Sequence, residues 1–296
     1  MKKNIIFRGC ATALITPFRD EGIDYTALAA LIDIQISAGI DCIVIGGTTG
    51  EASTLGDSER YELFAFAKER TEGRCKLMLG TGSNDTKKAM RYTAAASSIG
   101  ADGALVVTPY YNKGTKDGIV SHYLKIAEAS DIPIMLYNVP SRTGVNLSLE
   151  AVARLAECER IVGIKEASDS QDRLTALSAF GDSLYLYSGN DSQVYSTLAL
   201  GGLGVISVAS NIIPELMREL TSEYFLGRHG AALRLQKALL PFINALFAET
   251  NPAPIKYIMS KCGLCGDEIR LPLSMPKGDT ALLIEREYYA LPGRRE

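Results

Sequence analysis

One lysine of this chain stands directly after the run IVGI, in the segment IVGIKEAS at positions 161–168. At the inner end of a buried strand, the amine of Lys165 would lie in a poorly hydrated pocket, where desolvation disfavours the charged ammonium form. A neutral amine can attack a carbonyl carbon and form a Schiff base. The alternative is an ordinary lysine at the rim of a sheet, paired with Glu166 or Asp169. The position of the residue does not decide between these two interpretations.

Hydroxyl groups follow other apolar runs of the sequence. Schiff-base chemistry expels water, so it needs a group that donates and accepts protons, and a phenol can do this when a neighbour passes the proton on. Suitable hydroxyls are those of Tyr137 in YNVPSRTG, Thr48 in GGTTGE and Tyr111 in TPYYNKG. The alternative is that the tyrosines pack in the core and that the threonine caps a turn.

An arginine follows Tyr137 by five residues, beside a glycine in the turn-like part of YNVPSRTG. Its planar guanidinium can bind a carboxylate with two parallel hydrogen bonds, which a lysine cannot do. Seen alone, Arg142 would be read as a solvated loop residue. Near a candidate proton donor, it indicates a place where the carboxylate of a substrate is bound.

Eight short and nearly continuous apolar runs are available to position these side chains. Such runs are typical of strands that are covered on both faces, and hence of a parallel sheet with helical crossovers. Between them lie stretches with helical periodicity, such as 25–39, 58–70, 85–100 and 147–159. The eight runs begin at positions 10, 42, 76, 103, 132, 161, 184 and 203.

Eight such units over about 210 residues predict an α/β protein, a (β/α)8 TIM barrel made by residues 1–210. The carboxyl ends of its strands would bring Thr48, Tyr137 and Lys165 to one face, where barrel enzymes have their active sites. The rival fold is a doubly wound open sheet, which would more naturally have five or six strands and a glycine-rich dinucleotide turn. The nearest candidate for that turn, GTGSND at 80–85, lacks the third glycine.

The remaining residues, 211–296, have the pattern of helices joined by short links. We expect them to form a small helical C-terminal domain that packs on the barrel. Pro241 and the NPAP segment at 251–254 are expected to punctuate these helices, because proline lacks the N–H group that a helix interior uses.

The composition excludes several classes of protein. The chain of 296 residues has a formal net charge of -3, without the basic stripe of a nucleic-acid binder. Its apolar runs are far shorter than the ~20 residues of a membrane span. Arg8 interrupts the first apolar stretch before it could serve as a signal peptide. We therefore expect a cytoplasmic protein that binds neither nucleic acid nor membranes.

Two of the six cysteines, Cys262 and Cys265 in CGLC, have the spacing of a redox pair or of half a zinc site. Zinc would need two further ligands, and His122 and His229, the two histidines of the chain, have no metal-like spacing. We therefore expect no metal site, and we expect the thiols to be reduced and to pack as small hydrophobic groups.

The order and spacing of six motifs resemble the dihydrodipicolinate synthase family, also called 4-hydroxy-tetrahydrodipicolinate synthases. The resemblance covers essentially the whole chain, including RLPL at 270–273. GGTTGE and the Lys165 motif are shared by the wider superfamily of pyruvate-dependent class I aldolases, including N-acetylneuraminate lyase and 2-keto-3-deoxy-acid aldolases. The arginine of YNVPSRTG is more selective and looks like the synthase. The six motifs are GGTTGE, TPYYNKG, YNVPSRTG, GIKEAS, GVISV and NPAPIKY.

The resemblance implies a lyase that condenses pyruvate with L-aspartate 4-semialdehyde, in the diaminopimelate route to L-lysine. Pyruvate would form a Schiff base with Lys165, and the enamine derived from it would attack the semialdehyde. Transimination would then release the cyclic product, 4-hydroxy-tetrahydrodipicolinate. By the same resemblance, Tyr137 would donate and accept protons, and Thr48 and Tyr111 would complete the relay. No metal or organic cofactor is implied.

The resemblance also assigns residues that bind the two substrates. Thr49 and the backbone of Ile206 would hold pyruvate, and Arg142 would bind the carboxylate of the semialdehyde. Gly189, at the end of the seventh apolar run, would belong to the same substrate site. In the family, Tyr111 is lent by a neighbouring subunit, and the usual assembly is a homotetramer built from two tight dimers.

Many members of the family are inhibited by L-lysine, which binds in a pocket at the dimer interface. In lysine-sensitive members a glutamate stands at the position of Lys88, and histidines stand at those of Asp57 and Arg60. A cation in place of a carboxylate repels the ammonium group of the ligand, so we expect weak or absent inhibition. The alternative is that Lys88 is a solvated helix residue without regulatory meaning. The matching positions are Ala52, Ser53, Asp57, Arg60, Asn84, Lys88 and Tyr110.

Two positions depart from the family pattern. Gly114 stands where the family often has proline, and DSQD follows GIKEAS in place of a more common GN-type continuation. Two other functions compete with the synthase. Arg142 argues against an aldolase that acts on a sugar acid, since such relatives commonly lack it. The intact lysine, tyrosines and threonines argue against a catalytically idle ligand sensor.

Overall fold

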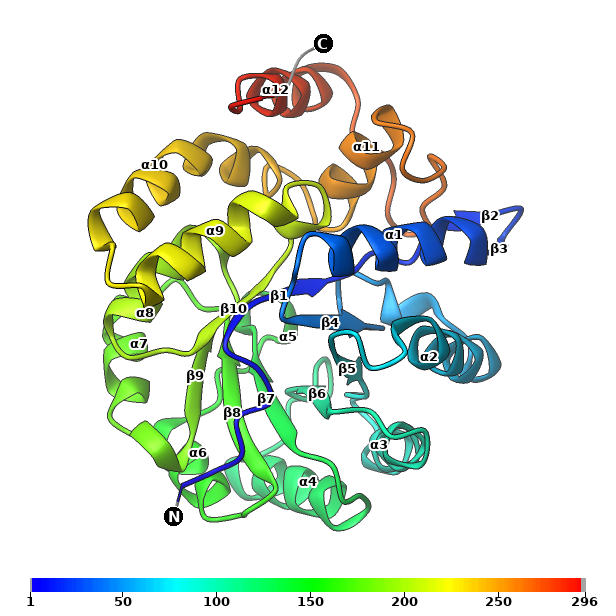
Figure 1. Cartoon of the computed structure of the whole chain (residues 1–296). Helices are drawn as coiled ribbons and strands as arrows, with labels where there is room; N and C mark the ends of the chain where they lie inside the picture. The colour runs from blue at the N-terminus through cyan, green and yellow to red at the C-terminus, as the bar shows by residue number, and fades with distance from the viewer. Residues whose placement is uncertain (1, 294–296) are drawn as a thin grey trace.

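Eight parallel strands form a closed barrel in the computed structural model, which describes residues 2–293. Each strand falls on one of the predicted apolar runs, so the predicted barrel is confirmed (Figure 1). Their order around the barrel is β1, β10, β9, β8, β7, β6, β5, β4. Their bounds are β1 Gly9–Ala13, β4 Cys42–Ile45, β5 Lys76–Gly80, β6 Gly103–Val107, β7 Ile134–Asn138, β8 Ile161–Glu166, β9 Tyr185–Ser188 and β10 Gly204–Ser207.

Helices surround this barrel (Figure 1). Several begin where polar side chains accept hydrogen bonds from the first free N–H groups, as Asp24 does for α1, Asp85 for α3 and Ser148 for α6. A small hairpin of β2 (Phe18–Arg19) and β3 (Gly22–Ile23) precedes α1. The helices are α1 Tyr25–Ser37, α2 Asp57–Thr71, α3 Thr86–Ser98, α4 Lys116–Glu128, α5 Pro140–Thr143, α6 Leu149–Ala156, α7 Gln171–Ser178, α8 Val194–Ala199 and α9 Pro214–Phe225.

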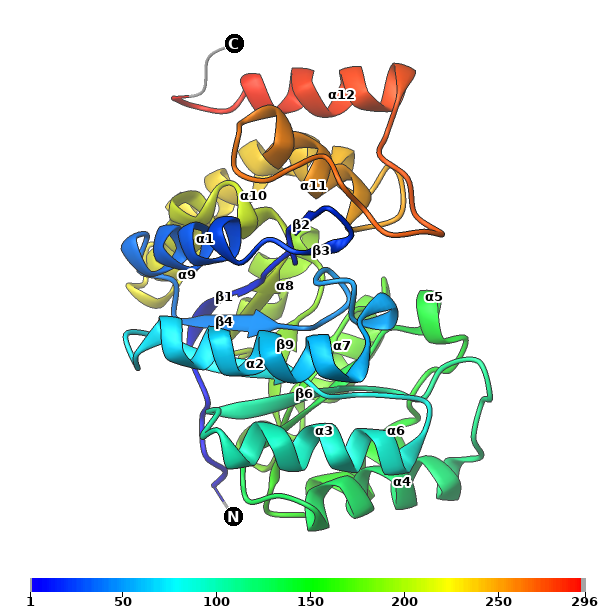
Figure 2. The ribbon, with the colours of Figure 1, turned by 90° about the vertical axis from the view of Figure 1, so that its right-hand side faces the viewer.

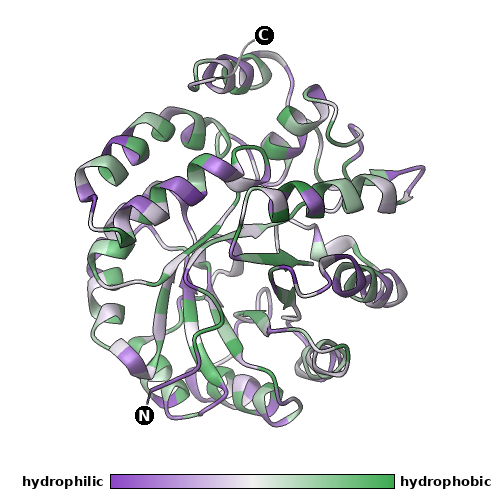
Figure 3. Cartoon of the chain, in the orientation of Figure 1, coloured by the Kyte–Doolittle hydropathy of each residue, from purple (hydrophilic) through white to green (hydrophobic). Residues whose placement is uncertain are grey.

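The strands are apolar on both faces because they separate two hydrophobic layers. Side chains such as Met78, Met135 and Tyr187 fill the inside of the barrel. Their sequence neighbours, such as Leu77 and Leu136, pack outward against the helices. Figure 3 shows the same division, with hydrophobic strands inside and hydrophilic stretches on the surrounding helices. Side chains that point inward and side chains that point outward both pack in apolar layers. This explains why the apolar runs of the sequence are nearly continuous.

The segment before β1 closes the amino-terminal end of the barrel. The hydroxyl of Tyr187 donates to the carbonyl of Phe7 over 2.6 Å, and the two ring centroids are 4.7 Å apart. Tyr185 donates in the same way to the carbonyl of Lys3. The carboxyl ends of the strands, toward which β4 points in Figure 2, remain as the end where a site can form.

The C-terminal helices α10 (His229–Ala245), α11 (Ala253–Lys261) and α12 (Gly278–Tyr289) lie on the side of the barrel opposite α4 (Figures 1 and 2). Pro241 lies inside α10, so the expectation that it interrupts the helices is wrong. The buried side chains Leu239, Phe242 and Ile243 continue the packed face across the proline, and this packing outweighs the loss of one backbone hydrogen bond.

The division of the chain at residue 210 stays a prediction. Helix α9 packs against β1, as the helix that follows the last strand of the barrel, and also against α10. None of the helices between residues 2 and 293 is long and apolar enough to cross a membrane.

Candidate active site

The pairing of β7 with β8 places Tyr137 beside Lys165 and Asn138 beside Glu166. Since side chains alternate along a strand, Tyr137 and Lys165 face the inside of the barrel and the other two residues face outward. The Nζ atom of Lys165 lies 4.3 Å from the centroid of the Tyr137 ring. Both side chains are buried, so the predicted amine and the predicted proton donor lie together.

Glu166 uses its carboxylate elsewhere. It accepts a hydrogen bond of 2.8 Å from Nε of Arg173, on the outer face of the barrel. Within residues 2–293, no carboxylate lies within 4.0 Å of the Lys165 amine. The alternative interpretation, a lysine paired with Glu166 or Asp169, is therefore wrong for this structure.

The amine of Lys165 borders a cavity of about 880 Å³ at the carboxyl ends of the strands. Three predicted substrate residues, Thr49, Arg142 and Gly189, border the same cavity. Gly189 lies so close to β8 that a Cβ atom there would come within 2.6 Å of the Ala167 Cβ atom. That atom would also come within 2.8 Å of the Glu166 carbonyl, so only glycine fits at this position.

A second cavity, of about 290 Å³, adjoins the first. Tyr137 and Arg142 border both cavities, and Thr48 borders the second. Four of the seven predicted regulatory residues line the second cavity: Ala52, Ser53, Arg60 and Tyr110. The other three, Asp57, Asn84 and Lys88, line neither cavity, and Lys88 is exposed on α3.

Two predicted site residues lie apart from the cavities within this one chain. Tyr111 is 89% exposed and adopts a left-handed backbone with φ of 70°. Ile206 is fully buried in the inner layer of the barrel. Neither residue borders either of the two cavities described above.

Asn251 is a site residue that the sequence reasoning missed. Its Nδ2 atom donates to the hydroxyl of Thr49 over 3.0 Å, and its carbonyl accepts from the guanidinium of Arg142 over 2.7 Å. It also borders both cavities. The sequence predicts a break between helices at NPAP, and the resemblance includes NPAPIKY as a motif, but neither assigns Asn251 a role in the site. A polar residue at a helix boundary close to the barrel was the available signal.

Asp191 is a second missed residue, directly after Asn190 at the end of β9. It is buried on the wall of the larger cavity, which Lys165 also borders. One carboxylate oxygen accepts from the backbone N–H groups of Val208 and Ala209. Burial raises the pKa of Asp191, whereas its hydrogen bonds and the charge of Lys165 oppose this rise. Asp191 thus connects the end of β9 to the turn after β10, on the same cavity wall as Lys165.

The chain matches the model of the family described as "Dihydrodipicolinate synthetase family" over residues 6–284. It is 44% identical over 270 residues to a protein of Alkaliphilus oremlandii (strain OhILAs) named 4-hydroxy-tetrahydrodipicolinate synthase. That match covers 91% of this chain and 93% of the relative.

Solved structures agree with the sequence relatives. Dihydrodipicolinate synthase from Aquifex aeolicus superposes with a TM-score of 0.94 at 41% identity, covering 97% of this chain and 99% of that chain. A structure described as the first monomeric dihydrodipicolinate synthase variant also has a TM-score of 0.94, at 38% identity, and covers 96% of this chain and 97% of the other.

Proposed function

The chain belongs to the dihydrodipicolinate synthetase family, and we propose that its reaction proceeds through a Schiff base on Lys165. The enzyme is a lyase that condenses pyruvate with L-aspartate 4-semialdehyde to 4-hydroxy-tetrahydrodipicolinate, in the diaminopimelate route to L-lysine. The observation that supports the role of Lys165 is its position: a buried amine against the Tyr137 ring, bordering the larger cavity.

In the proposed mechanism the Lys165 nitrogen attacks the keto carbon of pyruvate, and the carbonyl oxygen leaves as water. Loss of a proton from the methyl carbon gives an enamine, which attacks the aldehyde carbon of the semialdehyde. The amino group of the bound semialdehyde then displaces the Lys165 nitrogen, so that the ring closes and the enzyme is regenerated. Each step needs a proton carrier, and we assign this role to Tyr137, whose ring centroid lies 4.3 Å from the amine.

The substrate roles are proposals of the same kind. Arg142 binds the carboxylate of the semialdehyde, with Asn251 holding its guanidinium at the rim of the cavity. Thr49 binds the carboxylate of pyruvate, and its hydroxyl is oriented by Asn251. Gly189 and the backbone of Ile206 complete the wall around pyruvate.

We propose that Thr48 and Tyr111 extend the proton relay from Tyr137, and that Tyr111 comes from a neighbouring subunit. This tyrosine is 89% exposed, and Leu271 is 83% exposed. Their sequence neighbours Tyr110 and Pro272 line the smaller cavity. Two large exposed side chains beside a cavity favour an interface with a second copy, and a homotetramer made of two tight dimers is the proposed assembly.

A cytoplasmic location is also proposed. The six cysteines of the chain are free thiols, which fits a reducing compartment. Cys262 and Cys265, at the end of α11, are among them, and no redox role is proposed for this pair.

The test combines trapping with an assay. Incubation of the enzyme with pyruvate and borohydride should give a stable mass adduct on Lys165, and Lys165→Ala should remove the adduct while the fold is retained. A coupled assay should then show turnover with L-aspartate 4-semialdehyde and none with sugar-acid aldehydes. Unchanged trapping in Lys165→Ala would place the Schiff base on another residue.

A further inference from the structure

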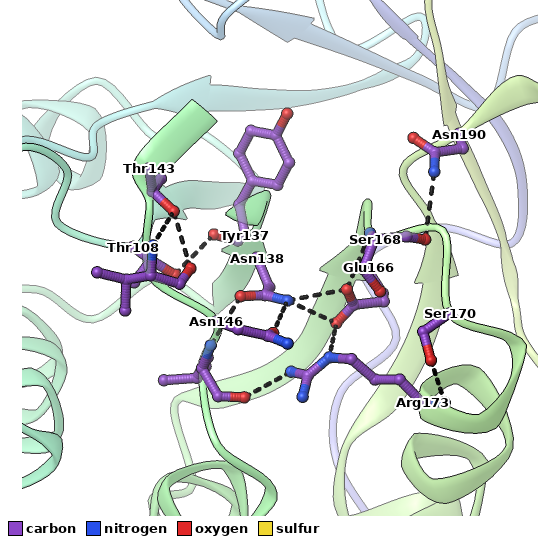
Figure 4. A network of polar contacts seen from close by, with 12 residues as sticks. Thr108, Tyr137, Asn138, Thr143, Asn146, Glu166, Ser168, Ser170, Arg173 and Asn190 are labelled. Atoms are coloured by element: carbon purple, nitrogen blue, oxygen red, sulfur yellow. Dashed lines mark hydrogen bonds and ion pairs between the residues drawn. The ribbon is translucent and has the colours of Figure 1, made fainter. Parts of the chain in front are cut away.

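A closed ring of hydrogen bonds lies on the outer face of the two strands that carry Tyr137 and Lys165. Its members are the side chains of Asn138, Glu166 and Arg173 and the backbone of Leu147 (Figure 4). Asn138 and Glu166 have no exposed surface, and the side chain of Arg173 is 9% exposed. The ring is therefore a buried polar network inside an otherwise apolar layer.

Glu166 is the acceptor at the centre of this ring. Its Oε1 atom accepts from Nδ2 of Asn138 over 2.8 Å and from the backbone N–H of Ser168 over 3.0 Å. Its Oε2 atom accepts from Nε of Arg173 over 2.8 Å and from the Asn138 amide over 3.1 Å. Both oxygens are satisfied, which a buried carboxylate requires.

The ring closes through the segment between α5 and α6. The N–H group of Leu147 donates to Oδ1 of Asn138 over 2.9 Å, and its carbonyl accepts from Arg173 over 2.6 Å. The Asn138 amide also donates to Oδ1 of Asn146 over 2.9 Å. The ring thus joins β7, β8 and α7 to the segment that follows Arg142.

Each strand residue of the ring directly follows a proposed site residue. Asn138 follows Tyr137, Glu166 follows Lys165, and in Figure 4 the Tyr137 ring points away from the contacts of Asn138 and Glu166. A slip of one residue between the two strands would turn the site residues outward. The backbone carbonyl of Glu166 also accepts from the N–H of Gly189 over 2.7 Å, which connects β9 to the same point.

We propose that this ring is a positioning device, in which Glu166 and Arg173 hold the ends of β7 and β8 so that the Lys165 amine lies against Tyr137 and faces the cavity. The inference rests on the proposed role of Lys165. Stability alone does not account for the ring, because well-packed apolar residues often stabilise such a position as well as a buried ion pair. Glu166 and Arg173 are positioning residues, since they act through Lys165 and do not border the larger cavity.

The decisive variant is Glu166→Gln, which keeps the shape of the side chain but removes the charge that faces Arg173. Asp102→Asn is the control, at a carboxylate whose ion pair with Lys76 is more exposed. Asp102 accepts from the N–H of Leu77 over 2.9 Å and from Nζ of Lys76 over 2.7 Å, at the opposite end of the barrel. Asp102, just before β6, thus connects to β5. Glu166 connects β8 to β7 in a similar way, but Asp102 lies far from Lys165.

The readout is the rate of borohydride-trapped Schiff-base formation with pyruvate, expressed per folded protein by circular dichroism. Small displacements of reacting groups are costly, so Glu166→Gln should slow this step by roughly tenfold to a hundredfold. The control should trap pyruvate at the wild-type rate. If Glu166→Gln does not fold, Arg173→Lys keeps the charge but loses the planar group that spans Glu166 and Leu147, and the same slowing is expected.

One outcome would overturn the inference about the ring, and another would overturn the proposed function. A ring variant that melts at a lower temperature but traps pyruvate at the wild-type rate would make the ring purely structural and overturn the inference. A wild-type enzyme that is trapped on a residue other than Lys165 would overturn the proposed function itself, and the inference with it. Slower trapping of pyruvate in Glu166→Gln, with the wild-type rate in Asp102→Asn, would support the inference and the proposed function.

Discussion

The Nζ atom of Lys256 lies 2.5 Å from Oε1 of Glu51, and the two side chains are 0% and 2% exposed. Glu51 ends the GGTTGE motif, two residues after Thr49, and Lys256 lies in α11. The second oxygen of Glu51 accepts from the backbone N–H of Arg270 over 3.0 Å. Helix α11 and the segment between α11 and α12 therefore hold the turn that carries Thr48 and Thr49.

Glu51→Gln should destabilise the enzyme by about 3 to 5 kcal/mol, because it leaves the Lys256 ammonium buried without its counter-charge. Urea unfolding curves measure this change. Asp117→Asn is the control, since the ion pair of Asp117 with Arg154 is exposed and should contribute little. Equal midpoints for the two variants would show that the buried pair does not stabilise the turn.

Arg142→Ala should impair turnover with L-aspartate 4-semialdehyde but spare Schiff-base formation with pyruvate. Losing charge-assisted hydrogen bonds to a carboxylate should cost about 2 to 3 kcal/mol, a factor of roughly 30 to 150 in kcat/KM. Steady-state kinetics and borohydride trapping measure the two steps separately. Equal damage to both would indicate that Arg142 is structural, for example through its contact with Asn251.

Tyr111→Phe should strongly reduce kcat, since the ring remains and only the hydroxyl is lost. If Tyr111 completes the site of a neighbouring subunit, mixing Tyr111→Phe with Lys165→Ala should restore part of the activity. A hybrid dimer then contains one site with both lesions and one site with neither. No recovery after verified subunit exchange would argue that each subunit works alone.

L-lysine should inhibit the enzyme weakly or not at all. Arg60 is buried beside Tyr92, with its guanidinium carbon 4.5 Å from that ring centroid, and it lines the smaller cavity. Arg60 therefore brings positive charge to this cavity, whereas Lys88 is exposed on α3 and lines neither cavity. Even about 1.4 kcal/mol of repulsion weakens binding tenfold. A dose–response curve with submillimolar, cooperative inhibition would contradict this expectation, and Lys88→Glu alone need not restore sensitivity while Arg60 remains.

Acid should weaken the fold through His122. Burial lowers the pKa of His122 from 6.5 to about 4, and its Nδ1 atom is hydrogen-bonded to Thr86 over 2.9 Å. The unfolded chain therefore binds a proton more readily than the folded one. The contribution of His122 is fully present above pH 6.5 and is lost as the pH falls toward about 4.

The loss through this one residue should reach at most about 3 kcal/mol. Melting temperatures between pH 4.5 and pH 8 measure it, with His122→Gln as the variant that cannot titrate. The two curves should converge as the pH falls through this window. Curves that stay parallel would assign the acid sensitivity to other groups.

The sequence by itself determined the barrel architecture and the meeting of Tyr137 with Lys165 inside it. Nearly continuous apolar runs and helical periodicity are local patterns, and they were enough to predict eight strands in a closed barrel. The positions of Tyr137 and Lys165 at strand ends were enough to predict that they meet, because parallel strands end at one edge. The short hairpin β2–β3 and helix α5 were not predicted, since elements of two to four residues have no periodicity to detect.

Only the tertiary structure decided which partners the polar residues have. The carboxylate of Glu166 has Lys165 beside it in the chain but binds Arg173, because alternation along β8 turns the two neighbours to opposite faces. Asn251 binds Thr49 from 202 residues away and Arg142 from 109 residues away. Such contacts depend on how the closed barrel and the C-terminal helices pack, and no local pattern of residues contains that information.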